Sequence, residues 1–573
     1  MYNKILVIKI LTSIVTIFLI SVPITSALFY ENYTSNINNL NEGEGYTLFA
    51  PQSSSTTYLI NYNKEVVHVW ESDYIPGHSA YLLENGHLLR TAFLGAHPVF
   101  VSGGMGGGIQ EIDWNGTVVW DFTYSSNTYL SHHDIKHLPN GNVLMIAWEL
   151  KDYAEAVTAG RNPDIISMFG IWPDHIIEVE PTGPTSGDIV WEWHVWDHLI
   201  QDYDHSKQNY GVVEDHPELV DINYITPSES DWMHTNSIDY NEEFDQLLLS
   251  VHNFNEIWVI DHSTTTEEAA GHAGGNSGKG GDLLYRWGNP RTYRAGTIND
   301  QKLFGQHDVR WIEPGYPGEG NILVFNNGLG RPGLAYSSVD EIVPPVDSNG
   351  NYYLEPGSAY GPEEQIWIYT AENPTDFYAY MISGAQRIAN GNTVICDGKQ
   401  GIFFEVTNEK ETVWEYINPY PNQYLNTVFK IERYPSNYSG LANLIQQPKN
   451  PERPIGTING EIGIEYNYTS ITTDPQDDQM YFMFDWGDNS NSGWIGPYNS
   501  GEIVNSSHIW TRKGNYNIKV KAKDIYGHQS DWSNPLSVTM PRDRVLNAPF
   551  LRFFEYHPFL FKILQLLFQR LGL

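Results

Sequence analysis

Four histidines of this chain stand at one fixed spacing ahead of a turn. His78 precedes Asn85-Gly86 by seven residues, and His133 precedes Asn140-Gly141 by the same spacing. The other members of the set are His234 before Asn241, His307 before Pro314-Gly315, and Ser383 before Asn390-Gly391. An imidazole can ligate a metal, hold an anion, attack an electrophile or carry a proton. We therefore expect the four histidines to meet in one site.

A second group of polar residues comes after the apolar strand that follows each turn. Its members are His97, Glu149, His252, Asn253, Asn326, Asn327, Arg331, Lys399 and Gln400. A guanidinium among imidazoles opposes a divalent cation and suits a phosphate-like or sulfate-like oxyanion. Glu149 favours a cation instead. On balance we expect an anion site that holds neither a metal nor another cofactor.

A repeat must position these residues. Its signature is two usually apolar residues followed by aromatic-x-aromatic, the alternation of a strand with one packed face. The copies are VVHVW (66–70), VVWDF (118–122), IVWEW (189–193), LLYRW (283–287), QIWIY (365–369) and TVWEY (412–416). Turn residues stand before several copies, as in hairpins that enter an outer strand.

The repeat predicts an all-β fold, a six-bladed β-propeller over residues 45–445. In a propeller the outer strand of one blade leads to the inner strand of the next, and the inner strands line a central channel. A residue at the start of each inner strand then faces the channel mouth. We expect residues 46–70 to supply outer strands to the last blade, whose inner strand begins near Asn426 or Thr427, and residues 194–233 to be a loop insertion.

Three segments resemble the arylsulfotransferase family: DWMHTNSIDYNEEFDQLLLSVHNFNEIWVID, GQHDVRWIEPGYPGEGNILVFNNGLGRPG and HHDIKHLPNGNVLMIAW. The resemblance covers roughly residues 45–440. It implies a six-bladed propeller outside the cytoplasm. It also implies transfer of a sulfuryl group from an aryl sulfate to a phenol through a sulfated histidine, without a nucleotide donor. By motif, His234, His307 and Arg331 match the sulfate-binding and catalytic positions.

The chain departs from the family at the nucleophile. The family's histidine follows the second strand of the fifth blade, where this chain has CDGKQGIFFEV with Lys399 and Gln400. The paired cysteines of bacterial members are also missing. We expect His307 to act as the nucleophile, with His234 and Arg331 as further catalytic residues and Lys399 as the rival nucleophile. The expected substrate-binding residues are His78, His97, His133, His252, Asn327 and Lys399.

The composition limits the domain count and the partners. A chain of 573 residues exceeds one ordinary core, so we expect two or more domains. The net charge of −37 leaves no basic face to neutralise phosphates, which argues against a nucleic-acid partner. The single cysteine, Cys396, excludes an intrachain disulfide and a thiolate metal cluster.

The N-terminus predicts export. Lys4 and Lys9 precede an apolar run, and Thr25-Ser26-Ala27 has the small residues of a cleavage site, so residues 1–27 read as a signal peptide. An uncleaved anchor is the alternative. We expect the mature protein to be extracellular or at the cell surface.

A second domain follows a Pro-rich linker at 446–456. Residues 457–541 resemble a PKD domain, an Ig-like β-sandwich that implies a surface spacer or an adhesion module. The resemblance rests on Trp486-Gly487-Asp488, His508-x-Trp510, Gly514-x-Tyr516 and Asp524-x-x-Gly527. We interpret Asp488 and Asp524 as turn-forming carboxylates rather than Ca²⁺ ligands.

The C-terminal tail, 547–573, is apolar but interrupted by charges such as Lys562. The nearly apolar run Phe559–Phe568 is shorter than the roughly 18 residues that span a bilayer. It fits a short amphipathic helix in peripheral contact with a membrane or cell surface. A helix packed on the protein's own surface is the alternative.

Three functions remain open. The histidines and Arg331 favour an exported aryl-sulfate sulfotransferase. The missing nucleophile fits a non-catalytic surface propeller that binds a sulfated or phenolic ligand or a surface protein. Quinone-dependent dehydrogenases are also Trp-rich propellers, but they usually carry eight blades.

Overall fold

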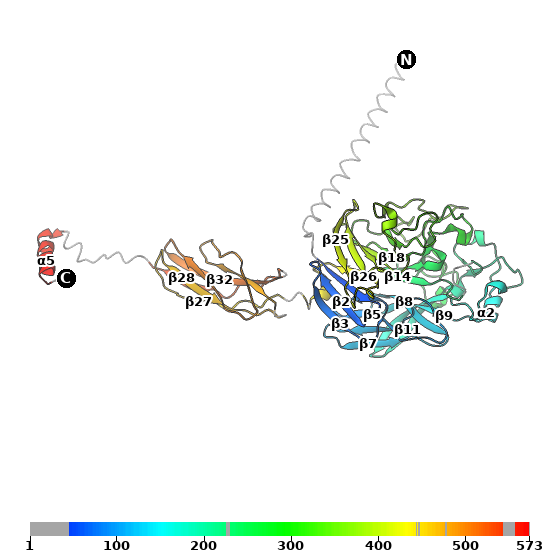
Figure 1. The fold of residues 1–573 in the computed structure, drawn as a ribbon, viewed down its shortest axis with the longest axis horizontal. Helices are drawn as coiled ribbons and strands as arrows, with labels where there is room; N and C mark the ends of the chain where they lie inside the picture. The colour runs from blue at the N-terminus through cyan, green and yellow to red at the C-terminus, as the bar shows by residue number, and fades with distance from the viewer. Residues whose placement is uncertain are drawn as a thin grey trace, which may run out of the picture. The chain divides into compact units, whose positions relative to one another are not determined.

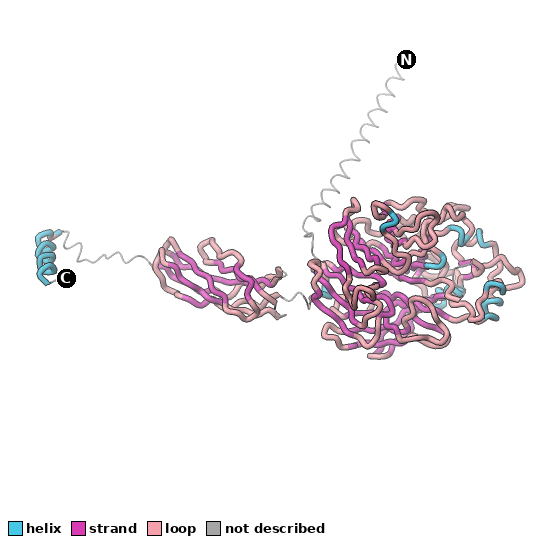
Figure 2. The backbone as a smooth tube through the Cα atoms, in the orientation of Figure 1, coloured by secondary structure: helices cyan, strands magenta, loops and turns pink. Residues whose placement is uncertain are grey.

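The computed structural model describes residues 45–224, 230–442, 444, 447–475, 478–525, 527–541 and 556–571. The chain divides into two compact units, Met1–Leu441 and Ala442–Leu573. Strands dominate both units, and helices are confined to short segments (Figure 2). The expected signal peptide, residues 1–27, lies outside the described residues.

Among the described residues, the first unit holds six four-stranded antiparallel sheets. Five are consecutive along the chain. Their strands are β4 (Pro76–Leu82), β5 (Leu88–Phe93), β6 (Gly107–Ile112) and β7 (Val118–Thr123); β8 (Tyr129–His137), β9 (Val143–Glu149), β10 (Asp174–Gly183) and β11 (Ser186–His194); β14 (Thr235–Asn241), β15 (Gln246–Val251), β16 (Glu256–Asp261) and β17 (Tyr285–Trp287); β18 (His307–Trp311), β19 (Ile322–Asn326), β20 (Ser338–Ile342) and β21 (Trp367–Tyr369); and β22 (Gly384–Arg387), β23 (Thr393–Asp397), β24 (Ile402–Val406) and β25 (Thr412–Ile417).

The sixth sheet joins the two ends of the unit. Its order is β26 (Val428–Tyr434), β1 (Tyr46–Pro51), β2 (Thr56–Asn61) and β3 (Val66–Glu71), so the N-terminal strands complete the last sheet as the sequence predicted. The blue strands accordingly lie beside the yellow β26 (Figure 1). The first strands of the sheets contact one another in the cycle β4, β8, β14, β18, β22, β26 and back to β4, which is the arrangement of a β-propeller.

The repeated tryptophan of each fourth strand connects its sheet to the next one. Each indole N–H donates to a backbone carbonyl of the following sheet, which lies between the third and fourth strands or, for Ser186, at the first residue of the fourth strand. The pairs are Trp70 to Asp113 (3.2 Å), Trp120 to Ser186 (3.0 Å), Trp193 to Gly281 (2.7 Å), Trp287 to Pro362 (2.8 Å), Trp367 to Asn408 (2.9 Å) and Trp414 to Tyr62 (2.8 Å). The repeat therefore supplies both the packed face of a strand and a polar link between neighbours.

Three insertions lie within or between the sheets of β8–β11 and β14–β17. Residues 150–173 carry the helix α2 (Tyr153–Thr158), and the insertion that follows β11 carries the parallel pair β12 (Leu199–Ile200) and β13 (Val220–Asp221). Residues 262–284 carry the helix α3 (Thr266–Ala269), whose N-cap Thr265 forms a capping box with Glu268. Thus the described part of the insertion expected at 194–233 has some of its backbone in strands.

The second unit is a β-sandwich. One sheet has the order β27 (Ile455–Gly456), β28 (Glu465–Ser470), β31 (Val504–Ile509), and the other has β30 (Ile495–Tyr498), β29 (Met480–Asp485), β32 (Gly514–Asp524), β33 (Leu536–Met540). Burial alternates along β32, and Tyr468, Trp486 and Trp510 pack in the core. β27 lies in the segment expected to be a linker and pairs with β28, so the sandwich begins before residue 457.

The C-terminal segment contains the helix α5 (Pro558–Leu571). Apolar side chains such as Phe559 and Leu566 are exposed on it. Within the described residues, every helix is too short or too polar to cross a membrane.

The tryptophan links make a testable prediction about stability. Trp193 is fully buried, so Trp193→Phe leaves the Gly281 carbonyl without a partner and should lower the free energy of unfolding by about 1–3 kcal/mol. Trp367→Phe is the matched control, because its bond to Asn408 is exposed and water can replace the indole. Urea unfolding followed by circular dichroism measures both losses. Equal losses would contradict the role assigned to the buried link.

Candidate functional site

Five histidines form an arc, in which His78, His133, His234 and His307 lie in or next to the first strands β4, β8, β14 and β18, and His252 follows the second strand β15. Neighbouring ring centroids lie 5.1 Å apart for His78 and His133, 4.5 Å for His133 and His234, 5.2 Å for His234 and His252, and 5.2 Å for His252 and His307. We call these residues the histidine arc. Phe429 of β26 lies against three of them, with centroids 4.8 Å from His78, 6.0 Å from His133 and 6.2 Å from His307. The expected convergence of His78, His133, His234 and His307 is present, and His252 joins them.

The backbone turns these side chains inward by a repeated irregularity. β4, β8, β14 and β18 each carry a register shift near their start. Left-handed φ angles occur at His78 (136°), His133 (55°), His234 (55°) and Ser383 (85°). In β18 the left-handed residue is Asp308 (49°), so His307 stands one position earlier than its counterparts. Counting back from Pro314 therefore aligned His307 one residue out of register.

His307 has both ring nitrogens engaged within the protein. Its Nδ1 lies 2.9 Å from Asn327 Oδ1 and 3.2 Å from the Gly305 carbonyl, so this nitrogen carries the proton. Its Nε2 accepts from the Ile382 amide at 3.2 Å. Asn327 is equally committed, because its Nδ2 donates to the carbonyls of Ala379 and Ile382. These bonds disfavour His307 as a nucleophile and Asn327 as a direct substrate ligand.

His252 presents an open nitrogen. Its Nδ1 lies 2.8 Å from Asn253 Oδ1, and Asn253 Nδ2 donates to the Asp231 carbonyl, which fixes the amide and hence the proton on Nδ1. The ring is half-buried, and Nε2 makes no hydrogen bond to the part of the chain that the structure describes. A methyl group at Gly305 would lie 3.2 Å from this Nε2, so glycine keeps space beside it. A neutral imidazole with an open, oriented Nε2 suits nucleophilic attack.

His234 forms a dyad with Asp231. The imidazole Nδ1 lies 2.5 Å from Asp231 Oδ2, and the same carboxylate accepts from Ser102 Oγ (2.5 Å) and Trp148 Nε1 (2.9 Å). Burial opposes protonation of His234, but the charge and hydrogen bond of Asp231 outweigh it, so the pKa of His234 is raised. Asp231 was not singled out from the sequence, although it stands three residues before His234 in DWMH.

The other members of the arc remain neutral. Burial, with the charge of His234 next in importance, lowers the pKa of His78 to about 3 and that of His252 to about 4. Burial likewise holds the pKa values of His133 and His307 well below their ordinary range. The arc therefore combines one imidazole that holds a proton readily with neutral imidazoles that can accept or attack.

Arg331 supplies a cation without a carboxylate partner among the residues that the structure describes. Its guanidinium donates to Tyr336 Oη and Ser338 Oγ, each at 3.3 Å, and lies over the rings of Tyr336 (4.3 Å) and Phe304 (5.2 Å). Its Nε is buried without a hydrogen bond. Phe304 directly precedes Gly305, the residue beside His252 Nε2. Arg331 is thus available to an anion near the open imidazole.

Lys399 and His97 differ in whether their contacts leave a group free to bind a ligand. Lys399 is half-buried, and its ammonium lies 5.8 Å from the centroid of Tyr380 without a described ion pair. His97 Nδ1 accepts from the amides of Val99 (3.2 Å) and Phe100 (3.1 Å), so it caps its own loop. Glu149, the residue that favoured a cation, pairs with Lys151 (2.7 Å) and His194 (3.3 Å) instead of with the arc. Of these three, Lys399 has a charge left for a ligand.

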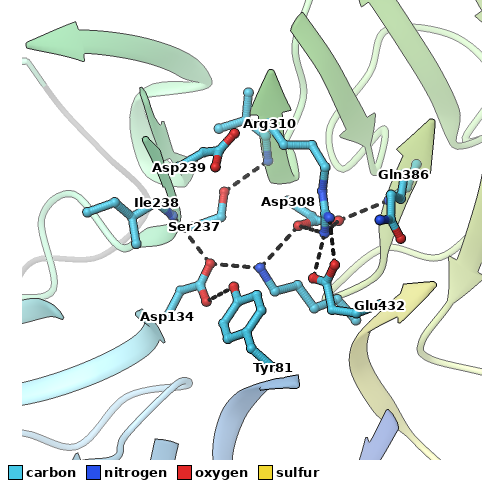
Figure 3. A network of polar contacts seen from close by, with 12 residues as sticks. Tyr81, Asp134, Ser237, Ile238, Asp239, Asp308, Arg310, Gln386 and Glu432 are labelled. Carbon is cyan, nitrogen blue, oxygen red and sulfur yellow. Dashed lines mark hydrogen bonds and ion pairs between the residues drawn. The ribbon is translucent and has the colours of Figure 1, made fainter. Parts of the chain in front are cut away.

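A buried ionic network follows directly after the arc along the first strands (Figure 3). Lys430, next to Phe429, lies 2.8 Å from Asp134 and 3.2 Å from Asp308. Tyr81 donates to Asp134, and Arg310 bridges Asp308 and Glu432. Burial opposes the charge on Lys430, but the two aspartates outweigh it and raise its pKa.

The network reaches all six first strands. The amide of Ile238 in β14 donates to Asp134, and the amide of Ala385 in β22 donates to Asp308. Tyr81 lies in β4, and Lys430 lies in β26. The network thus joins the first strands through buried ion pairs and hydrogen bonds, and it fixes the strands that carry the histidines.

The comparisons with known proteins agree with the family resemblance of the sequence. The family model of arylsulfotransferase (ASST) matches residues 70–438. The chain therefore belongs to the arylsulfotransferase family, the enzymes that transfer sulfuryl groups between aryl sulfates and phenols. A search of the curated proteins gives no match.

Two solved structures add to the comparison. The PKD domain of an M14-like peptidase from Thermoplasmatales archaeon SCGC AB-540-F20 is 48% identical, over 17% of this chain and 97% of that chain, with a TM-score of 0.16. A protein of unknown function from Bacteroides caccae is 12% identical, over 68% of this chain and 98% of that chain, with a TM-score of 0.37.

The dyad makes a prediction about pH. Because the folded-state pKa of His234 is raised, its protonation stabilises the fold fully below the ordinary imidazole pKa, and this contribution is lost as pH rises through the folded pKa. Binding of inorganic sulfate, measured by calorimetry, should weaken over the same window. Asp231→Asn should move this loss to lower pH. Ser102→Ala is the control, since it removes a bond to the same carboxylate without removing the charge. An unchanged pH profile in Asp231→Asn would contradict the assignment.

Proposed function

We propose that the protein transfers a sulfuryl group from an aryl sulfate to a phenol through a sulfated histidine, and that His252 is the nucleophile. The observation that carries the proposal is the open Nε2 of His252, whose tautomer is fixed by Asn253. His307, the residue expected from the sequence, lacks a free lone pair because Nε2 accepts from Ile382. His307 instead positions Asn327 and the loop at Ile382.

In the first step, Nε2 of His252 attacks the sulfur of the aryl sulfate. The bond between sulfur and the phenolic oxygen breaks, and its electrons leave with the phenolate. The imidazolium of His234 gives its proton to that oxygen, and Asp231 stabilises the protonated form beforehand. The sulfated His252 keeps its proton on Nδ1, and this N–H continues to donate a hydrogen bond to Asn253 Oδ1.

In the second step, the acceptor phenol reverses these transfers. Its oxygen attacks the sulfur while its proton passes to neutral His234, and the bond between sulfur and Nε2 breaks. His234 is then protonated again, and Nε2 of His252 regains its lone pair. The proposed reaction therefore needs no cofactor. It predicts ping-pong kinetics.

Cationic groups hold the sulfate oxygens in this proposal. Arg331 offers a planar fork that makes no ion pair in the described part of the chain, although the buried Asp340 lies near it, and Lys399 offers a second, more mobile charge. His78 and His133 are neutral, and each can donate one N–H to the same oxygens. Donors of this kind stabilise charge as it redistributes in the transition state.

An exposed apolar rim offers a place for the aryl group. Val101 is 70% exposed beside Ser102, and Leu329 is 46% exposed next to Gly305. Met381 is 40% exposed beside Ile382. Exposed apolar side chains gathered on loops next to polar groups favour a ligand with one apolar and one charged end.

Sulfation of one residue tests the nucleophile directly. The protein is mixed with p-nitrophenyl sulfate without acceptor, quenched, and its peptides are analysed by mass spectrometry. We expect a sulfated peptide that contains His252, and no label in His252→Ala. A label on His307 or Lys399 would reject the assignment.

Kinetic variants test the remaining roles. Arg331→Ala should raise KM by weakening anion binding. His234→Ala should slow transfer roughly 10²–10⁴-fold, the usual loss of a general acid or base. Lys399→Ala is expected to act mainly on KM, as a ligand of sulfate rather than a nucleophile. If the wild-type protein binds aryl sulfates but transfers no sulfuryl group to any phenol, the alternative of a non-catalytic binding propeller replaces the proposal.

The proposal extends to the location of the protein outside the cytoplasm, with α5 in peripheral contact with a membrane. The N-terminal sequence supports export, and the exposed apolar residues of α5 beside Lys562 and Arg570 support interfacial binding. The mature protein should float with anionic vesicles, whereas a variant without residues 547–573 should not. Leu566→Gln with Leu567→Gln is the matched control of full length, and it should float weakly. Equal flotation of all three forms would reject the contact.

A further inference from the structure

Three side chains with metal-ligating atoms meet between the insertion that follows β11 and the segment that joins α3 to β17, outside the histidine arc. His198 comes from the insertion after β11, and His272 and Asp282 come from the segment between α3 and β17. Their ligand atoms all lie within 4.8 Å of one another. Asp282 Oδ1 lies 2.8 Å from Nδ1 of His198 and 2.8 Å from Nδ1 of His272.

The protonation of His198 is constrained by its second nitrogen. Nε2 lies 2.8 Å from the carbonyl oxygen of Ala269, which can only accept, so Nε2 carries a proton. In a neutral imidazole Nδ1 then carries a lone pair, and this lone pair faces the carboxylate of Asp282. A cation bound by both atoms, to one side of the line that joins them, removes the repulsion between this lone pair and the carboxylate oxygen. A metal-ligating histidine commonly donates its other N–H to a backbone carbonyl in this way.

The surrounding loop packs closely against His198, and hydrogen bonds within the loop and to Asp261 and Ser263 also hold it. A methyl group at Gly281 would lie 2.6 Å from His198 Nε2 and 2.0 Å from the Ala269 carbonyl, so only glycine fits there. The segment GHAGGNSGKGGD (271–282) contains no large apolar side chain that could anchor it in a core. Trp193 donates to the carbonyl of Gly281, which ties this loop to the tryptophan link described above. A bound ion would offset the entropy lost when so glycine-rich a loop is ordered.

We infer that His198 Nδ1, His272 Nδ1 and the Asp282 carboxylate form a binding site for a divalent transition metal, with zinc as the best-suited ion. Two imidazole nitrogens and one carboxylate oxygen are ligands that zinc prefers, and calcium and magnesium favour oxygen alone. His198 and Asp282 are buried, and His272 is exposed, so His272 leaves room for water as a fourth ligand. The ion joins the glycine-rich loop to the insertion that follows β11. The site is independent of the histidine arc and of the proposed sulfuryl transfer.

Metal binding to the purified full chain tests this inference. After treatment with a chelator, the protein is dialysed against Zn²⁺, and bound metal is measured by elemental analysis. We expect one zinc ion per chain that is lost in His272→Ala, and a zinc-dependent rise in Tm. Co²⁺ should give the visible absorption of a tetrahedral nitrogen and oxygen site. His272→Ala and Asp282→Asn should each weaken binding by more than about 10-fold.

Two controls keep the result interpretable. His216→Ala removes another imidazole that pairs with a carboxylate, Glu218 at 2.8 Å, and it should leave zinc binding unchanged. His252→Ala alters the arc and should also leave it unchanged. Because His272 is exposed, His272→Ala should keep the circular dichroism spectrum of the wild type. Absence of zinc in the wild type, or loss of zinc in His252→Ala but not in His272→Ala, would overturn the inference.

Discussion

The first unit depends on a cycle of indole-to-carbonyl hydrogen bonds at its perimeter. Each link joins a fourth strand to the sheet that follows, and Trp414 to Tyr62 completes the cycle where the two ends of the unit meet. Apolar packing between sheets is non-directional and tolerates sliding, whereas these bonds fix the position of each sheet against the next. The register of the first strands, and hence the place of each histidine, follows from that constraint.

Charge is distributed unevenly over the two layers of the channel. The layer of Lys430, Asp134 and Asp308 is buried and ion-paired, so removal of one partner would leave a costly isolated ion. The histidine arc next to it is almost uncharged, because burial disfavours every imidazolium and only His234 has a carboxylate, that of Asp231, which outweighs burial. The rigid charged layer thus gives the neutral layer a fixed frame, and protonation at one dyad sets the charge of the mouth.

The fold could be predicted from the sequence because its signals are local. The six aromatic repeats fall in β3, β7, β11, β17, β21 and β25, and the N-terminal strands complete the last sheet. The convergence of His78, His133, His234 and His307 followed from the same repeat. The spacing rule placed His307 one residue out of register, because left-handed backbone and bulges are set by neighbouring strands.

The roles within the site could not be predicted in the same way. The choice between His252 and His307 depends on which nitrogen meets Asn253, Asn327 or Ile382, and these partners lie on different strands or loops. Lys430 and Phe429 read as ordinary strand residues until the ring closes and brings them into the channel.

The sixth sheet also determines the order in which the unit can be completed. β1 pairs on one side with β26, nearly four hundred residues later in the chain, as in Tyr46 with Tyr434. One edge of β1 therefore has no hydrogen-bonding partner until β26, the last strand of the ring, has been made. Such a distant pairing raises the contact order and slows closure, and an unpaired edge is prone to join other chains in the meantime. The architecture therefore places its greatest risk of aggregation at the moment before the ring closes.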